Sequence, residues 1–209
     1  MSDNLARDFK IFAITGNIAS GKSTIGEIFK KDGFIVIDSD DLSREATVVG
    51  SNALRQISCH FGSQVINHDG SLNRKKLAGI VFNSKSKLKE LEDILHPSIR
   101  QLFLKKIQLN INNITVFYLV PLLFEKGLQN DLILGKPFDK IIHISCNKEK
   151  SIERILSRDN SSAHEAEVRL NNQLSNEEKI KLADIIIDNN SSKENLNIEI
   201  DKLLQELKL

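Results

Sequence analysis

The most constraining feature of the sequence is the nine-residue segment GNIASGKST, at residues 16–24. It follows the apolar run IFAIT and precedes IGEIFKKDG, a stretch with helical character. Gly16, Gly21, Lys22 and Ser23 satisfy the pattern G-x-x-x-x-G-K-[ST], which is typical of a phosphate-binding loop. Glycines let consecutive backbone N–H groups of such a loop turn toward phosphate oxygens. The segment therefore predicts a strand, a tight loop and a helix whose N-terminus faces phosphate.

The side chains of this loop indicate a nucleoside triphosphate. Lys22 is expected to reach the outer phosphates, and the Ser23 hydroxyl is expected to bind Mg²⁺. GTP-binding proteins read guanine with an N-K-x-D segment, whereas residues 147–150 read NKEK and end in lysine. We therefore predict an ATP site built on Gly16, Asn17, Ile18, Ala19, Ser20, Gly21, Lys22, Ser23 and Thr24.

Five apolar runs predict the strands of a parallel sheet. They are residues 10–15, 34–38, 115–120, 140–145 and 184–188. Their β-branched residues are continuous rather than alternating, as in strands that are covered on both faces. Because helical patterns separate the runs, we predict an α/β fold with a five-stranded parallel sheet. A serine-capped stretch with apolar residues at Leu196, Ile200, Leu203, Leu204 and Leu207 predicts a final helix packed on this core.

The length of 209 residues suits one domain with insertions. We expect a core of about residues 8–40, 114–148 and 183–209. The first long connection, about 41–113, is predicted to be helical with a break at His96-Pro97, because proline disfavours helical geometry in the residue before it. It is either a substrate-binding insertion or a helical layer without a binding role. The second, about 149–182, is highly charged and is either a solvated helical pair or a mobile lid.

Composition and charge exclude several classes of partner. The 29 basic and 28 acidic residues give a net charge of +1, which argues against nucleic acid as the main partner. No apolar run approaches the roughly 20 residues that a membrane span needs. The start MSDNLARDFK lacks the features of a secretory signal, and the two cysteines lack metal-ligand spacing. We therefore expect a cytoplasmic protein that binds small molecules.

A cluster of acids follows the second predicted strand, in the segment IDSDDLSRE. Asp38, Asp40 and Asp41 stand at the carboxyl end of the strand, where open parallel sheets place their ligands. Helix capping by Ser39 or Asp40 accounts for one acid only. Three acids near bound phosphates repel them unless one binds Mg²⁺ or accepts a proton. We therefore predict a functional role for Asp40, with capping as a secondary role.

The phosphate loop followed by VIDSDDLSRE resembles the dephospho-coenzyme A kinase family, whose second strand ends in D-A-D-x-I-x-R. Further stretches match that family in the family's own order: HFG (60–62), DGSLNRKKL (69–77), LEDILHPSI (91–99), VPLLFE (120–125), SIERILSRD (151–159) and DIIIDNN (184–190). The resemblance covers nearly the whole chain. Asn17 and Ala19 stand where the family loop usually has glycine. If either position needs a positive φ, asparagine tolerates it better than alanine.

The resemblance implies a P-loop kinase with a helical acceptor-binding insertion and a lid. Such an enzyme transfers the γ-phosphate of ATP to the 3′-hydroxyl of dephospho-coenzyme A, the last step of coenzyme A biosynthesis. By position, Asp40 would take the hydroxyl proton, or it would bind Mg²⁺ together with Ser23. Lys22 and Arg154 would neutralise charge on the transferred phosphate.

The resemblance also implies roles for residues outside the loop. Arg154, Arg158 and Asn189 would complete the ATP site, while Asp40, Arg44, His96 and Glu125 would contact the acceptor. Each has a simpler alternative. The lid arginines could form ion pairs with Glu153 and Asp159 on a solvated helix, and Arg44 could pair with Asp40. His96 could be structural, Asn189 could be a turn residue, and Glu125 could order Mg²⁺-bound water or fix the loop.

Two other functions compete with this interpretation. The protein could be a different small-molecule P-loop kinase, acting on a nucleoside or a nucleoside monophosphate. It could also be a nucleotide-binding regulator without catalytic activity. The regulator hypothesis predicts the loss of Lys22 or Asp40, and both are present.

Overall fold

The computed structural model describes residues 9–81, 84–108, 115–130, 136–159 and 161–209. These residues divide into two compact units. The first unit takes the described residues of Met1–Asp38, Asn113–Asp131 and Pro137–Leu209. The second takes those of Ser39–Asn112 and Leu132–Lys136, and so consists mainly of the long connection between the second and third strands.

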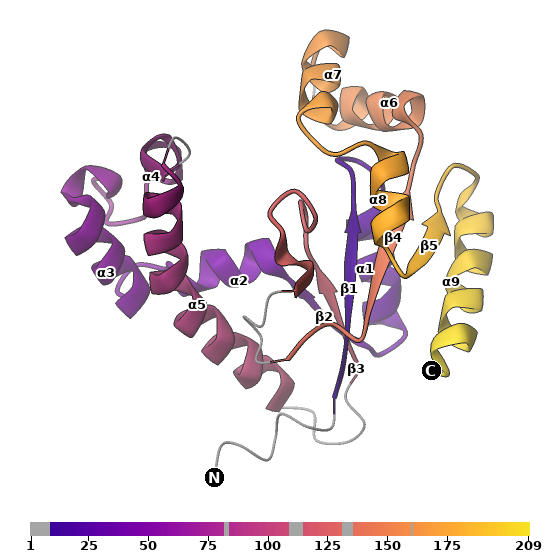
Figure 1. Cartoon of the computed structure of the whole chain (residues 1–209), viewed down its shortest axis with the longest axis horizontal. Coiled ribbons are helices and arrows are strands. Elements are labelled where there is room, and N and C mark those ends of the chain that lie inside the picture. Colours follow the sequence, from indigo (N-terminus) through magenta and orange to yellow (C-terminus); the bar gives the residue numbers. More distant parts are fainter. Residues whose placement is uncertain (1–8, 82–83, 109–114, 131–135, 160) are drawn as a thin grey trace. The chain divides into compact units, whose positions relative to one another are not determined.

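A parallel sheet forms the centre of the first unit (Figure 1). Its strands are β1 (Lys10–Gly16), β2 (Ile35–Asp38), β3 (Thr115–Leu119), β4 (Lys140–Ser145) and β5 (Ile185–Asp188), in the order β2-β3-β1-β4-β5. Ile14 on β1 lies opposite Leu119 on one side and Ile142 on the other. The predicted α/β fold is confirmed, and each strand begins and ends within one residue of its predicted bounds.

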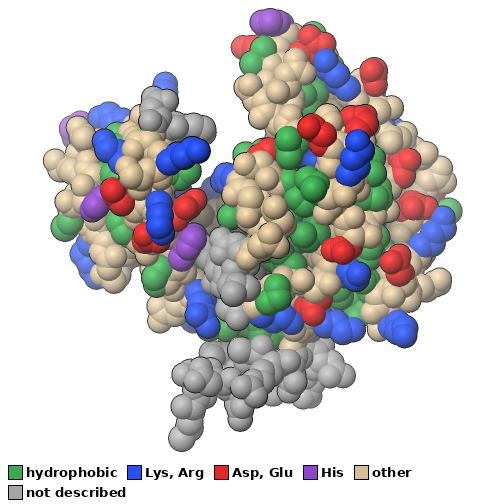
Figure 2. Space-filling view, in the orientation of Figure 1, with side chains coloured by type: hydrophobic (Ala, Val, Ile, Leu, Met, Phe, Trp, Pro, Cys, Tyr) green, Lys and Arg blue, Asp and Glu red, His purple; other side chains and the backbone are tan. Residues whose placement is uncertain are grey.

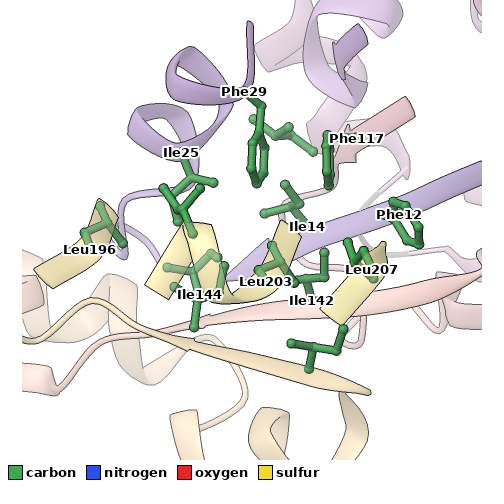
Figure 3. Packing of buried hydrophobic residues seen from close by; sticks show 14 residues of the cluster. Phe12, Ile14, Ile25, Phe29, Phe117, Ile142, Ile144, Leu196, Leu203 and Leu207 are labelled. Atoms are coloured by element: carbon green, nitrogen blue, oxygen red, sulfur yellow. The ribbon is translucent and has the colours of Figure 1, made fainter. Parts of the chain in front are cut away.

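Three helices of the first unit contact this sheet: α1 (Lys22–Lys31), α8 (Asn176–Leu182) and α9 (Lys193–Leu207). The helices α6 (Lys148–Asp159) and α7 (Ala163–Asn171) pack against each other, and a short 3₁₀ turn lies at Leu128–Asn130. Phe29 of α1 stacks on Phe117 of β3 with 3.9 Å between ring centroids (Figure 3). Leu203 and Leu207 of α9 are buried in the same apolar cluster. Each buried side chain of this size contributes about 1.5–3 kcal/mol, so this cluster fixes both helices on the sheet.

The order of the strands places the phosphate loop at a position suited to ligand binding. The chain passes from β1 to β2 on one side of the sheet and later crosses to β4 and β5 on the other. β1 is therefore at the topological switch point of the sheet, where open α/β sheets bind ligands beyond the carboxyl ends of their strands. The phosphate loop follows β1 directly.

The second unit is helical. It contains α2 (Ser39–Ala46), α3 (Asn52–Phe61), a 3₁₀ turn (Ser63–Val65), α4 (Arg74–Val81) and α5 (Lys85–Gln108). The long α5 packs against α2, α3 and α4. The second unit has its own apolar cluster, whose buried members are Ile57, Phe61, Val65, Leu77 and Val81. None of the helices in the described part of the chain is long and apolar enough to span a membrane.

The predicted helix break at His96 is wrong, because α5 continues through Pro97. A proline inside a helix costs about 3 kcal/mol, since it removes one backbone hydrogen bond and clashes with the preceding turn. Packing on both sides of Pro97 outweighs this cost. Leu95 packs on the apolar cluster of the second unit, while Ile99 and Phe103 are buried beyond the proline.

Candidate active site

The backbone of the phosphate loop requires its two glycines. Gly16 ends β1, and Gly21 caps α1 with a φ of 100°. A φ in this range favours glycine, and a Cβ at Gly21 would also collide with the side chain of Asn189. A Cβ at Gly16 would lie 2.8 Å from the Ile144 carbonyl oxygen. The glycines thus allow the close packing of the loop against β4 and the end of β5.

Lys22 lies against the loop that precedes it. Its Nζ donates hydrogen bonds to the carbonyl oxygens of Gly16 at 2.7 Å and Asn17 at 2.9 Å. These bonds hold the ammonium group beside the loop backbone, where phosphate oxygens would compete with the carbonyls for it. Ser23 and Thr24 follow in the first turn of α1, and both are exposed.

Ala19 adopts a strained conformation within the loop. Its φ is 60°, in the left-handed region, which costs a residue with a Cβ about 1–2 kcal/mol. Asn17 is not among the positive-φ residues of the described chain. Of the two positions where the family usually has glycine, alanine therefore occupies the strained one.

We predict that Ala19→Gly raises the free energy of unfolding by roughly 0.5–1 kcal/mol, because relief of strain exceeds the extra entropy of glycine in the unfolded chain. Urea denaturation measures this change. The matched control is Ala53→Gly in α3, which has no positive φ and should lower stability by at least about 0.5–1 kcal/mol. A loss of stability in Ala19→Gly as large as in the control would contradict the prediction.

Two residues distant in sequence hold the loop from one side. Asn189 follows β5, and its Nδ2 donates to the Ser20 carbonyl at 2.7 Å. Arg154 of α6 donates to the Ala19 carbonyl at 3.2 Å and to the Asn189 carbonyl at 3.1 Å. Both residues, which the sequence assigned to the ATP site, therefore contact the backbone of the phosphate loop.

Arg158 has different partners, although it lies one turn beyond Arg154. Its Nε and Nη2 donate to the carboxylate of Asp159 at 2.6 and 3.0 Å. Arg169 of α7 donates to the same carboxylate at 2.9 Å. Hydrogen bonding from Arg158 lowers the pKa of Asp159, so that the carboxylate stays charged. The structure thus shows, for Arg158, the ion pair that the sequence left open as the alternative.

The turn between α7 and α8 holds the other side of the loop. The Asn17 side chain donates to the Leu174 carbonyl at 3.0 Å. The backbone N–H of Ile18 donates to Gln173 Oε1 at 2.9 Å. A glycine at position 17 could not form the first of these bonds. Asn17 therefore ties the phosphate loop to the segment that was predicted to be a lid.

A buried ion pair supports this turn. Lys179 Nζ lies 2.7 Å from Glu125 Oε1, and the exposed fractions of the two side chains are 0% and 15%. The same carboxylate oxygen accepts a hydrogen bond from the Leu174 N–H at 3.2 Å. Glu125, which the sequence assigned to the acceptor, thus makes the contacts of its loop-fixing alternative. Lys179 was missed, because it belongs to the charged segment NEEKIKL, which is typical of a solvated helix.

We predict that Lys179→Met lowers the free energy of unfolding by about 3–5 kcal/mol, because it leaves the Glu125 carboxylate buried without its partner. The double variant Lys179→Met, Glu125→Gln should recover most of this loss. Urea denaturation of both variants tests the prediction. Lys181→Met on the exposed side of α8 is the control and should change stability by less than about 0.5 kcal/mol. Equal stabilities of the two single variants would contradict the role of the pair.

His143 joins α8 to the sheet. This buried residue of β4 lies opposite Thr15, and its Nε2 is 2.9 Å from Asn176 Oδ1. Asn176 also donates to Ser145 Oγ at 3.0 Å. Burial lowers the pKa of His143, and the positive charges of Lys179 and Lys22 lower it further, so the ring is neutral near pH 7. A single histidine within the apolar strand KIIHIS was the sequence signal for this contact.

The remaining predicted residues of the acceptor site lie in the second unit. Asp40 is exposed in the first turn of α2, which begins at Ser39, so Asp40 is a helical residue rather than a cap before the helix. Arg44 Nη1 donates to Asp41 Oδ1 at 3.1 Å, so the partner seen here is Asp41 rather than Asp40. His96 is half-buried in α5. The described residues contain no group of three or more His, Cys, Asp and Glu side chains that could hold a metal ion.

Comparisons with known proteins agree on one family. The sequence model described as dephospho-CoA kinase matches residues 10–195. Proteins named dephospho-CoA kinase from Oceanobacillus iheyensis and Fusobacterium nucleatum are 37% and 36% identical, over 94% of this chain and 96% and 98% of theirs. A solved dephospho-CoA kinase from Campylobacter jejuni is 34% identical with a TM-score of 0.62, covering 95% of this chain and 97% of its own.

Two further solved structures have folds similar to that of this chain. A Thermus thermophilus protein is 31% identical with a TM-score of 0.80, covering 96% of this chain and 99% of that one. A shikimate kinase from Acinetobacter baumannii is only 13% identical but has a TM-score of 0.53, covering 96% of this chain and 94% of its own, so it shares the fold alone. The family match spans most of the chain, including the phosphate loop and the acids that follow β2. The chain belongs to the dephospho-CoA kinase family.

Proposed function

We propose that this protein transfers the γ-phosphate of ATP to the 3′-hydroxyl of dephospho-CoA, giving CoA and ADP. Membership of the dephospho-CoA kinase family supports the acceptor. The observation that carries the proposal is the complete phosphate loop, which Arg154, Asn189 and the α7–α8 turn hold in place. The competing small-molecule kinase and regulator hypotheses are not favoured, because the family match runs from β1 into α9.

In the proposed mechanism, the phosphate loop positions ATP and neutralises its charge. Lys22 would exchange its loop carbonyls for oxygens of the outer phosphates. Arg154 lies beside the loop at Ala19 and would stabilise negative charge on the transferred group. Arg158 would join it by leaving Asp159, and Asn189 would border the nucleoside. Phosphoryl transfer needs mainly such positioning and charge neutralisation.

Asp40 would act on the acceptor. It follows the last residue of β2 by two positions and is exposed. A carboxylate at this position would accept the proton of the attacking hydroxyl. A carboxylate is also a ligand of the kind that Mg²⁺ takes, usually one or two of them together with phosphate oxygens and water. Ser23 and Asp40 would hold this ion, which supplies positive charge to the phosphates when bound.

The remaining features complete the proposal. Arg44 and His96 would contact the acceptor within the helical second unit, and Glu125 would act through the loop.

The balanced net charge and the mixture of basic and acidic side chains on the face shown in Figure 2 support small molecules rather than nucleic acid as partners. We also propose a cytoplasmic location, which the absence of a membrane-spanning helix in the described residues allows.

We predict that the segment from about residue 151 to 182 closes over bound ATP. Arg154 forms a hydrogen bond with Ala19, and the α7–α8 turn forms hydrogen bonds with Asn17 and Ile18. Binding of ATP to the phosphate loop should therefore change the contacts of this segment. Hydrogen exchange with and without a non-hydrolysable ATP analogue plus dephospho-CoA measures the effect. We expect slower exchange in α6 and α7, while unchanged exchange around Arg154 would count against a lid.

An acceptor panel tests the proposed function. The protein receives ATP and Mg²⁺ with dephospho-CoA, a nucleoside or a nucleoside monophosphate, and ADP release gives kcat/KM for each acceptor. We expect the highest value for dephospho-CoA. A higher value for a nucleoside or its monophosphate would favour the other kinase hypothesis. Binding of ATP without turnover of any acceptor would favour a regulator.

A further inference from the structure

The phosphate loop contains one residue whose backbone conformation its neighbours must maintain. Ala19 has a φ of 60°, whereas a residue with a Cβ prefers a negative φ. Such a conformation persists only where the surrounding structure over-determines it. Without that support, Ala19 would turn to a negative φ and would redirect the backbone N–H groups next to it. The contacts on either side of Ala19 therefore decide whether the loop keeps the shape that receives phosphate.

Two contacts hold the loop at Ala19 and directly after it. Arg154 donates to the Ala19 carbonyl at 3.2 Å, and Asn189 donates to the Ser20 carbonyl at 2.7 Å. A φ angle is fixed only when the chain is held on both sides of the bond about which it turns. The conformation of Ala19 therefore also depends on contacts that precede it in the chain.

Asn17 makes such a contact through its side chain. This residue is buried, and its Nδ2 donates to the Leu174 carbonyl at 3.0 Å. The same Leu174 donates its N–H to Glu125 Oε1 at 3.2 Å, and this oxygen lies 2.7 Å from the buried Lys179 Nζ. All four residues belong to the first unit. A continuous series of contacts thus joins the loop, before Ala19, to a buried ion pair.

A second contact before Ala19 is less rigid. The N–H of Ile18 donates to Gln173 Oε1 at 2.9 Å, which lies at the end of a long, half-buried side chain. Such a side chain can follow a small movement of the loop by changing its rotamer. The carbonyl of Leu174 is part of the backbone and cannot follow in this way. Asn17 is therefore the residue that fixes the loop before Ala19.

We propose that Asn17 is a positioning residue of the ATP site, which keeps Ala19 in its strained conformation and so holds the loop ready for phosphate. The two residues act as a pair, because the strain at Ala19 is what makes the hydrogen bond of Asn17 necessary. They are also the two positions at which this loop departs from the usual glycines of its family. The proposal rests on the proposed function only in taking ATP as the ligand.

A double-mutant cycle tests the pair. Asn17→Gly removes the donor, Ala19→Gly removes the strain, and calorimetric titration gives the Kd of a non-hydrolysable ATP analogue for the wild type and all three variants. With alanine at position 19, we expect Asn17→Gly to raise the Kd about three- to tenfold, the value of one hydrogen bond, because fewer molecules hold the competent loop. With glycine at position 19, we expect the same replacement to raise it less than about twofold.

Two further variants separate the hydrogen bond from other effects. Asn17→Leu keeps nearly the same shape but has no donor, so it should weaken binding as Asn17→Gly does, and it keeps the test usable if the glycine variant does not fold. Asn172→Gly replaces an exposed asparagine of the same turn and should leave the Kd unchanged. Wild-type affinity in Asn17→Leu would show that shape alone is needed and would overturn the proposal.

Kinetics distinguish positioning from a general loss of structure. A smaller fraction of folded enzyme lowers the apparent kcat without changing the KM for ATP. A loop that is less often in its competent conformation mainly raises the KM, and bound ATP then holds it in place. We therefore expect Asn17→Gly to raise the KM for ATP by a larger factor than it lowers kcat. A lower kcat at the wild-type KM would overturn the positioning role.

The cycle also separates this pair from the proposed function. Equal effects of Asn17→Gly with alanine and with glycine at position 19 would overturn the pairing, while a wild type that phosphorylates dephospho-CoA would leave the function in place. A wild type that does not bind the ATP analogue would overturn the proposed function, and the pairing with it.

Discussion

Replacing Asp40 with asparagine should lower kcat by about 10²- to 10⁴-fold, the usual contribution of a general base, with little effect on ATP affinity. The amide is nearly isosteric with the carboxylate but cannot accept the proton of the acceptor hydroxyl. Asp40 is exposed in the first turn of α2, so the fold should tolerate the change. Steady-state kinetics with dephospho-CoA as the varied substrate measures the effect.

The neighbouring acid provides the control, and Mg²⁺ separates two roles of Asp40. Asp41→Asn removes the exposed ion pair with Arg44 and should change kcat by less than tenfold. If Asp40 is only a base, Asp40→Asn keeps the wild-type dependence of rate on Mg²⁺ concentration. If it is a metal ligand, the variant needs much more Mg²⁺. Normal turnover of Asp40→Asn at ordinary Mg²⁺ would remove Asp40 from the mechanism and make Asp38 the next candidate.

Lys22→Ala should lower kcat by at least about 10²-fold, the loss seen when one preorganised charge-stabilising donor is removed. The ammonium lies on the carbonyls of Gly16 and Asn17 rather than in the apolar core, so we expect the fold to remain. Kinetics and thermal denaturation of the same sample separate the two effects. Lys30→Ala, in the exposed last turn of the same helix, should leave kcat unchanged. Wild-type turnover of Lys22→Ala would refute the assignment of the phosphate loop.

The parts of the fold that depend on local sequence could be predicted. Strands covered on both faces need continuous apolar residues, so their positions followed from runs such as KIIHIS. The glycines and the lysine of the phosphate loop stand at a fixed spacing in the sequence, because the loop backbone needs glycine at those positions and the lysine must reach the phosphates that the loop binds. These features also carried the resemblance that identified the family.

The residues that hold the phosphate loop in place could not be predicted from local sequence in this way. Gln173 bonds to Ile18 across 155 positions of sequence, and no local pattern encodes that contact. Lys179 is buried although its neighbours are charged, because one carboxylate, Glu125, lies within reach in the folded chain. Local rules also failed at Pro97, where tertiary packing outweighs the local cost of proline. Long-range contacts decide each of these cases.

The most direct measurement of the central claim follows a label from ATP to its product. The protein is incubated with dephospho-CoA, Mg²⁺ and ATP that carries ³²P in its γ-phosphate, and the labelled product is isolated. Phosphorus–proton coupling in the same product, prepared without radiolabel, locates the new phosphate on the ribose. The account predicts one labelled compound, CoA, with its phosphate on the 3′-oxygen. Label that appears only in inorganic phosphate, or on any other atom of the acceptor, would contradict it.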